Sequence, residues 1–323
     1  MAVPAARLSL SRRQSGVALI LAMLVMALVT AAVTAMAARQ QLDIRRTANL
    51  LDQDQAYLYA LAVETWGERV LQRDRKHNRI DDLKEDWARL PPPIQVEGGS
   101  LSGHIEDLQG RFNLNDLIVN GAPSAPDVAR FRRLLERLGL DPQRVQPVLD
   151  WLDPDQQPRF PGGAEDGYYL GLSPPYRAAN RPMVSPTELL LVAGFTPKIY
   201  DRLAPFITAL PTHTLVNVNT APAPVLAMLV PGLGLDDAKA LVQSRAVQPY
   251  RTPGDFLKQP AVQAWLQRDP ALTPILRQAI SVASGYFLIH SAVRIGRARV
   301  FLDSVVRRDP SGETVIMRTR ETP

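Results

Sequence analysis

The sequence predicts an α+β fold in which a long N-terminal helix and a small antiparallel sheet are interrupted by a large all-helical insertion. Residues 17–66 contain neither glycine nor proline, so that one helix can run through all of them. Residues 113–279 carry apolar side chains mainly at helical spacing, whereas residues 280–323 alternate apolar and polar side chains between turn sequences. The change of period near residue 280 marks the return from helices to strands.

The N-terminal end combines a basic segment with an uncharged apolar run. Arg7, Arg12 and Arg13 precede residues 17–38, in which no side chain carries a charge. At about 1.5 Å of rise per residue this run measures about 33 Å, which is long enough to cross the hydrocarbon core of a bilayer. Because the arginines flank its N-terminal side, we expect that end in the cytoplasm and the rest of the chain on the other side.

Three kinds of targeting segment compete for this arrangement. A secretory signal could be cut at the A-x-A sequence of residues 35–37, but such a signal needs an apolar core of only about 7–15 residues. Arg12 and Arg13 could belong to a twin-arginine signal, although residues 14–16 lack the apolar side chains expected next. In the third interpretation, which we favour, cleavage after Gly16 removes a short leader and the helix stays as an anchor.

Composition excludes several kinds of chemistry. The 323 residues include no cysteine, which excludes disulfides, thiolate catalysis and cysteine-based metal centres. Part of the net charge of +5 lies in the leader, so the basic balance is no argument for nucleic acid as a partner. The four histidines are scattered along the sequence without metal-ligand spacing, and nucleotide-binding and hydrolase motifs are absent. We therefore do not expect an enzyme.

Local signals place the elements in order. An apolar stripe from Leu50 to Val63 continues the first helix beyond the membrane, and the polar segment 69–93, which ends in three prolines, indicates that this helix has stopped and a loop follows. Residues 101–107 read as a strand. The predicted helices of the insertion are 127–138, 142–152, 187–193, 198–207 and 222–230, the last with Thr220 as its N-cap, and a long loop covers 153–186. The predicted C-terminal meander has strands at 285–295, 297–308 and 313–320.

These elements divide the chain into five parts. We expect a leader at 1–16, a transmembrane helix at 17–38, and the rest of the helix with the first strand of the head at 39–112. The insertion takes 113–279 and the C-terminal strands take 280–323.

An ordered set of short motifs resembles a known family, the type II secretion minor pseudopilin K (GspK), over essentially the whole chain. The motifs are the leader that ends at Gly16, GRFNLNDL at 110–117, DWLD at 150–153, GAED at 163–166 with the tyrosines at 168–169, PPYRAAN at 174–180 and VNVNTAP at 216–222. The resemblance implies a pseudopilin fold and a single-pass protein of the Gram-negative inner membrane with a periplasmic C-terminal domain. It implies that minor pseudopilins I and J are partners in a complex at the filament tip, which initiates or caps the filament and supports protein export. It also implies that prepilin peptidase cuts after Gly16 and methylates the new N-terminus at Val17.

The fifth residue after the predicted cut is Leu21. Major pilins carry a glutamate there, buried in the apolar filament core, where a carboxylate is costly unless it is paired. A subunit at the tip has no neighbour above it that needs this charge, and members of the K family share the exception. Leu21 therefore favours a tip subunit over a filament-body subunit; the alternative is an ordinary membrane residue of an unrelated anchor.

The best candidate for a chemical site is the loop of residues 150–166. It holds five carboxylates and a single basic residue, Arg159. Crowded carboxylates on a flexible loop repel one another unless a cation gathers them, and hard oxygen ligands suit Ca²⁺ better than Zn²⁺ or Mg²⁺. K-family pseudopilins resemble calcium binders in this loop, so we expect a structural Ca²⁺; the alternative is a solvated acidic loop. The candidate ligands are Asp150, Asp153, Asp155, Glu165 and Asp166.

Residues 230–257 offer a rival function. The sequence VPGLG at 230–234, followed by an apolar helical face, resembles a helix-hairpin-helix, in which backbone N–H groups hold DNA phosphate. It would make the chain a DNA-uptake protein at the cell surface. However, Asp236 and Asp237 follow the turn and only Lys239 lies nearby, whereas a phosphate-binding face needs a basic cluster. We therefore interpret the motif as a packing unit and expect no nucleic-acid partner.

Overall fold

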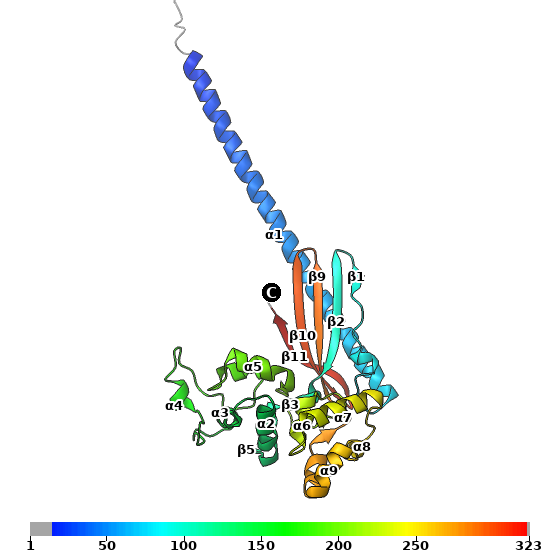
Figure 1. Ribbon diagram of the computed structural model, residues 1–323. Helices are drawn as coiled ribbons and strands as arrows, with labels where there is room; N and C mark the ends of the chain where they lie inside the picture. Colours follow the sequence, from blue (N-terminus) through cyan, green and yellow to red (C-terminus); the bar gives the residue numbers. More distant parts are fainter. Residues whose placement is uncertain (1–14, 322–323) are drawn as a thin grey trace, which may run out of the picture.

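A single helix organises the molecule. The computed structural model describes residues 15–321, and its first element, α1 (Ser15–His77), runs unbroken for 63 residues (Figure 1). The prediction that this helix had stopped by Arg69 is wrong. It continues through Gly67, where a Cβ atom would lie 2.7 Å from Cδ1 of Ile289, so the glycine permits close packing on the sheet. Arg75, Lys76 and His77 occupy the last turn, where positive charge stabilises the helix dipole.

The C-terminal half of α1 lies across one face of a five-stranded antiparallel sheet (Figure 1). The apolar helix residues buried there include Ala56, Ala60, Val63 and Leu71. The strand order is β1-β2-β9-β10-β11, from β1 (Ile94–Val96), β2 (Gly99–Asp107), β9 (Tyr286–Ile295), β10 (Ala298–Asp309) and β11 (Gly312–Glu321). The predicted C-terminal meander is confirmed, and β2 adds to it across a long stretch of sequence.

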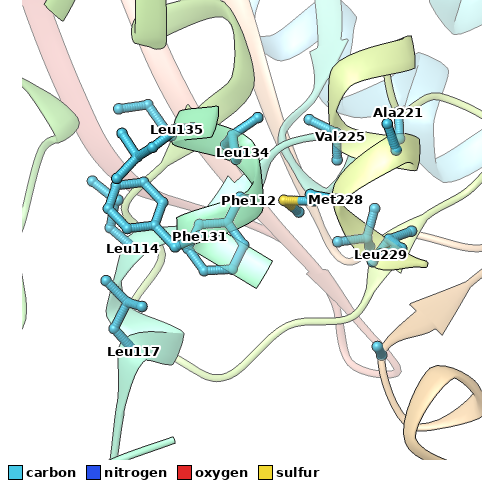
Figure 2. Packing of buried hydrophobic residues seen from close by; sticks show 14 of the residues in the cluster. Phe112, Leu114, Leu117, Phe131, Leu134, Leu135, Ala221, Val225, Met228 and Leu229 are labelled. Atoms are coloured by element: carbon cyan, nitrogen blue, oxygen red, sulfur yellow. The ribbon is translucent and has the colours of Figure 1, made fainter. Parts of the chain in front are cut away.

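The chain between β2 and β9 forms a separate, mostly helical body with its own core (Figure 2). Phe112 and Phe131 stack with ring centroids 5.4 Å apart at its centre, beside Met228 and Leu229. Its helices are α2 (Ala125–Arg137), α3 (Val145–Leu152), α4 (Asp166–Tyr169), α5 (Pro197–Leu203), α6 (Ala223–Leu229), α7 (Leu235–Val247), α8 (Pro253–Leu257), α9 (Pro260–Arg268) and α10 (Leu272–Arg277).

Two-residue strands and 3-10 turns complete the molecule. Strand β3 (Phe112–Asn113) pairs in parallel with β6 (Ile207–Thr208), β7 (Val216–Asn217) with β8 (Ile280–Ser281), and β4 (Ile118–Val119) pairs antiparallel with β5 (Ala122–Pro123). The 3-10 turns are η1 (Asp86–Ala88), η2 (Leu108–Gly110), η3 (Leu114–Leu117), η4 (Pro142–Arg144), η5 (Pro186–Leu191) and η6 (Ala204–Phe206). Two residues leave no periodic pattern, so these strands were not predicted and the insertion is not free of strands.

Two predicted helices and one predicted cap differ in detail. The segment predicted as a helix at 187–193 is the 3-10 turn η5, and the helix predicted at 198–207 ends at Leu203, shortly before Pro205. Thr220 does not cap α6, because its hydroxyl donates to the buried Asp107 Oδ2 at 2.6 Å, and Pro222 stands at the N-cap position instead. The local sequence pattern assigned the Thr220 side chain to the start of the helix, but the side chain bonds instead to Asp107, which lies far away in the sequence.

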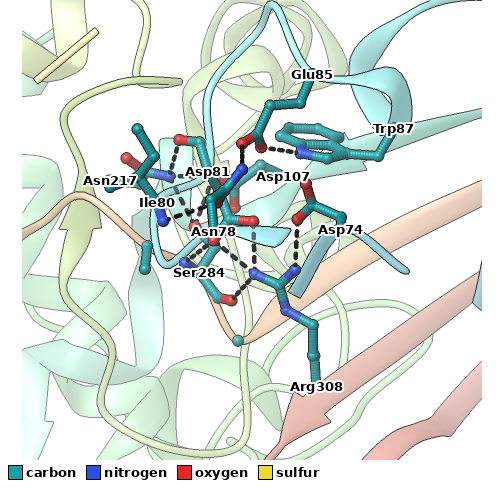
Figure 3. Close-up of polar contacts among 12 residues, drawn as sticks. Asp74, Asn78, Ile80, Asp81, Glu85, Trp87, Asp107, Asn217, Ser284 and Arg308 are labelled. Atoms are coloured by element: carbon teal, nitrogen blue, oxygen red, sulfur yellow. Dashed lines mark hydrogen bonds and ion pairs between the residues drawn. The ribbon is translucent and has the colours of Figure 1, made fainter. Parts of the chain in front are cut away.

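A buried polar network joins the insertion to the sheet (Figure 3). Asn217 Nδ2 donates to Asp107 Oδ2 and to the backbone carbonyl of Asp81, each at 3.0 Å. Ser284 Oγ donates to Asp107 Oδ2 at 2.7 Å, and Arg308 Nη2 lies 2.5 Å from both carboxylate oxygens of Asp81. Burial raises the pKa of Asp107, and the donors of Thr220 and Ser284 oppose this shift. The two bodies are therefore held in a fixed relation by directed hydrogen bonds.

Candidate functional site

The N-terminal half of α1 has the length and composition of a membrane span. Its strongly apolar window is wholly exposed, so the apolar surface is not part of a core of this chain. Leu21 is 61% exposed within it. Gly16 and Val17 lie in the first turn of α1, whereas residues 1–14, most of the predicted leader, lie outside the described residues. The helix can thus serve as an anchor and present its apolar side chains to lipid or to neighbouring helices.

The acidic loop begins at the C-terminal end of α3. Asp150 lies in the last turn, fully buried, and Asp153 follows directly after the helix. Arg159 folds back over both: its Nη1 lies 2.8 Å from Asp150 Oδ1 and contacts Asp153 Oδ2, while its backbone N–H donates to Asp150 Oδ2 at 3.0 Å. Asp150 is therefore satisfied by an arginine of the chain itself.

Three of the five predicted ligands have carboxylate groups that lie close together. Asp153, Asp155 and Glu165 each offer a carboxylate oxygen, and these atoms lie within 4.8 Å of one another. Among the described residues, Asp153 Oδ1 and both carboxylate oxygens of Glu165 are buried and have no hydrogen-bond partner. Burial first, and then the charges of Asp150, Asp153 and Asp155, raise the pKa of Glu165 to about 7. Crowded, unpartnered carboxylate oxygens are the arrangement that a hard cation stabilises.

The structure separates Asp166 from this cluster and adds a residue that was not predicted. Asp166 Oδ1 accepts from the backbone N–H of Ala178 at 3.0 Å, and its Oδ2 lies 3.5 Å from Arg177. Asn180 donates through Nδ2 to the backbone carbonyl of Asp155, and its own Oδ1 is buried without a donor in the part of the chain that is described. A neutral amide gives no charge signal in sequence, which is why Asn180 was not among the predicted candidate ligands. The oxygen set fits Ca²⁺.

Comparison with known proteins tests the predicted family. Family models described as "Type II secretion system (T2SS), protein K" match residues 110–212 and residues 216–274. A curated relative from Pseudomonas aeruginosa, type II secretion system protein K, is 39% identical in an alignment of 320 residues that covers 95% of this chain and 92% of the relative. The chain belongs to the type II secretion system protein K family.

Further relatives agree with this assignment. The Aeromonas hydrophila protein K is 35% identical, with 95% of this chain and 97% of the relative covered. A chain of the crystal structure of the GspK-GspI-GspJ complex from enterotoxigenic Escherichia coli matches with a TM-score of 0.77 and 26% identity, over 86% of this chain and 100% of that chain. The predicted α+β pseudopilin fold is therefore confirmed, and the chain is a minor pseudopilin of the type II secretion system.

The helix-hairpin-helix-like segment of this protein K does not present a phosphate site. Lys239 is paired with Asp236 at 2.8 Å, Arg137 donates to the carbonyl of Leu233 in the turn at 2.7 Å, and the buried Arg245 donates to the carbonyl of Val218 at 2.6 Å. Gly232, with φ of +82°, lies against the ring of Trp265. The turn therefore packs α6, α7 and α9 together, and DNA binding is not favoured.

The histidines are not all scattered in space. His104 on β2 faces His290 on β9, with ring centroids 4.3 Å apart, because the two residues are direct partners in the sheet register. Burial alone would lower the pKa of His290, but Asp303 and Glu106 outweigh it and raise the pKa to about 9. His290 lowers the pKa of Glu106 most strongly, burial opposes this effect, and the charge of Arg111 adds to it. The resulting pKa of Glu106 is about 2. Sequence spacing concealed this cluster, since the two strands lie far apart along the chain.

Proposed function

We propose that this chain assembles with minor pseudopilins I and J at the tip of the pseudopilus, where the complex initiates or caps the filament. The likeness to a GspK chain solved with GspI and GspJ carries this proposal. The exposed apolar half of α1, with Leu21 in place of an acidic residue, supports it, because a helix without a core charge needs no partner amine from a subunit above it. The role is structural, and it requires no catalytic group of the chain.

The assembly is tested with the full-length chain in detergent. Co-expression with pseudopilins I and J from the same organism, with a tag on one partner only, should yield a complex of the three chains on size-exclusion chromatography. Minor pseudopilins from an unrelated secretion system serve as the control for non-specific helix pairing. The proposal would be contradicted if I and J formed a complex without this chain and the chain eluted alone.

The proposed topology places the N-terminus in the cytoplasm and the head in the periplasm, with α1 spanning the inner membrane. Prepilin peptidase then cuts after Gly16 and methylates Val17, both of which lie at the exposed start of α1. Mass spectrometry of the mature protein purified from membranes should show a chain that begins with N-methylated Val17. A soluble periplasmic form that begins near Arg39 would show instead that the apolar segment is a cleaved signal.

The proposed cofactor is one structural Ca²⁺ held by Asp153, Asp155 and Glu165, with Asn180 as a further oxygen ligand. The unpartnered buried oxygens of Asp153, Glu165 and Asn180 support it, since a cation would neutralise their repulsion and satisfy them together. The expected role is to order the loop between α3 and η5.

Removal of the metal should therefore loosen this loop. We expect limited proteolysis between Asp153 and Asn180 to be slow with Ca²⁺ and at least about tenfold faster with a chelator, because local opening then costs less free energy. The Glu165→Gln variant should be cut fast under both conditions, whereas Asp236→Asn, which removes a carboxylate outside the loop, should behave as the wild type. Equal cleavage rates with and without the chelator would rule out a structural ion.

A further inference from the structure

A second cluster of potential metal ligands lies on the sheet, away from the acidic loop. His104 and Glu106 are on β2, and His290 is on β9. Their neighbours in the strand, Gly103 and Ile105, are buried; Gly103 lies against Val63 of α1, so His104 and Glu106 point to the opposite face of the sheet. This face is open to solvent, since the side chain of His104 is 43% and that of Glu106 is 36% exposed.

The three side chains place their ligand atoms at distances that suit a tetrahedral ion. Glu106 Oε1 lies 3.5 Å from His104 Nε2 and 3.7 Å from His290 Nε2, and all three atoms lie within 4.8 Å of one another. Zinc–nitrogen bonds of about 2.0–2.1 Å at tetrahedral angles place neighbouring ligand atoms about 3.3 Å apart. The two distances to Glu106 Oε1 are close to this value, and the two histidine nitrogens, which lie within 4.8 Å of each other, must approach further to hold the ion.

Each of two ligands is oriented by a further charged group. Asp303 Oδ1 lies 2.7 Å from His290 Nδ1, which holds a proton on Nδ1, so that a metal ion binds through Nε2 and displaces the proton there. His290 Nε2 is buried and, within residues 15–321, has no hydrogen-bond partner. Arg111 contacts Glu106 Oε2 and leaves Oε1 turned toward the histidines. A metal-binding histidine usually donates the N–H of its other ring nitrogen to a carboxylate or a carbonyl, which fixes the orientation of the ring.

We propose that His104, Glu106 and His290 form a site for a divalent transition-metal ion, with zinc as the expected occupant. The nitrogen-rich ligand set separates it from the all-oxygen acidic loop, which suits calcium. Three protein ligands leave a fourth position for water. The two rings now lie within 18° of parallel, so one of them must tilt for both lone pairs to reach one ion; His104 has the room to do so because it is the more exposed. The bound ion would link β2 to β9 across the outer face of the sheet.

The test is a calorimetric titration of zinc into the full-length chain in detergent. Excess Ca²⁺ is present to occupy the carboxylate loop. We expect one zinc ion per chain. His104→Gln should weaken binding at least tenfold, and since its side chain is largely exposed the variant should fold. Asp303→Asn should weaken binding about 10–100-fold through the orientation of His290. His213→Gln removes an exposed histidine elsewhere and should leave the affinity unchanged.

Cobalt provides an independent readout of the ligands. Co²⁺ in a four-coordinate nitrogen–oxygen site absorbs strongly in the visible range, and this band should appear with the wild type and with His213→Gln but not with His104→Gln. Zinc affinity that is the same in His104→Gln as in the wild type, or the absence of a saturable site for one ion, would overturn the proposal. The result does not depend on the tip assembly, and the cobalt band and the His104→Gln variant distinguish this site from the carboxylate loop.

Discussion

Asp74 shows how a single carboxylate near the end of α1 depends on its neighbours. It shares Arg308 with Asp81, and Glu85 lies close by (Figure 3). Burial first, and then the charges of Glu85 and Asp81, raise the pKa of Asp74 from 3.8 to about 7, although Arg308 acts against this. The folded chain therefore holds a proton on Asp74 that the unfolded chain releases between about pH 4 and pH 7. By linkage, the ionised group opposes folding, and this cost grows as pH rises through that window and is complete above about pH 7.

Replacing Asp74 by asparagine should remove this pH-dependent cost. We expect Asp74→Asn to match the wild type near pH 4 and to be more stable by about 1–3 kcal/mol at pH 8, since each unit of pKa difference corresponds to about 1.4 kcal/mol before solvent screening. Chemical unfolding followed by tryptophan fluorescence, to which Trp87 beside Glu85 and Phe287 contributes, measures it. The control Asp236→Asn, at an exposed site, should shift neither curve. A variant less stable than the wild type at pH 8 would mean that the Arg308 pair dominates.

At the scale of elements, the contact between α1 and the sheet depends on glycines. A Cβ atom at Gly103 of β2 would overlap Val63 of α1 and lie 2.9 Å from the backbone carbonyl of His290, whereas one at Gly67 would meet only the side chain of the buried Ile289, with Cδ1 nearest at 2.7 Å. We expect Gly103→Ala to destabilise the fold by about 1–3 kcal/mol through overpacking. Gly67→Ala should cost less, because alanine gains about 1 kcal/mol of helix propensity there.

The comparison of these two variants is made by denaturant unfolding of the full-length chain. Adding Ile289→Val, which removes the clashing Cδ1 atom, should restore most of the loss in Gly67→Ala but none of the loss in Gly103→Ala, whose obstacles are Val63 and the backbone carbonyl of His290. Equal effects of the two glycine substitutions would show that the helix shifts freely on the sheet.

The same elements show what sequence could predict. Long periodic segments were read correctly: the start of α1, the helical insertion and the C-terminal strands each carry a signal over many residues. Residues whose role depends on distant partners were not, as with Thr220, which bonds to Asp107, and with the last turns of α1, where Leu71 of a segment predicted to be a loop is buried against the sheet. In the acidic loop the carboxylates were found, but only folding shows that Asp150 and Asp166 are engaged elsewhere and that Asn180 bonds to the backbone of Asp155 with its own Oδ1 left unpartnered.

For the whole molecule, the central question is whether the insertion and the sheet unfold together. The network of Asp81, Asp107, Asn217, Ser284 and Arg308 couples them through buried hydrogen bonds between segments far apart in the chain (Figure 3). Each buried donor or acceptor left without a partner costs about 1–3 kcal/mol, so partial separation of the two bodies is unfavourable. We infer that they form one cooperative unit.

Asn217→Ala should break this coupling. The substitution leaves Asp107 Oδ2 and the carbonyl of Asp81 without the Asn217 donor, so we expect a loss of about 1–3 kcal/mol and separate opening of the sheet and the insertion. Hydrogen exchange with mass spectrometry measures both bodies at once: β9 and α2 should share one opening free energy in the wild type and differ in the variant. The matched control is Asn115→Ala, which removes an equally connected amide whose partners, Met183 and Leu210, lie within the insertion. That control should lower stability without separating β9 from α2, and an identical exchange pattern in the two variants would contradict a coupling role for Asn217.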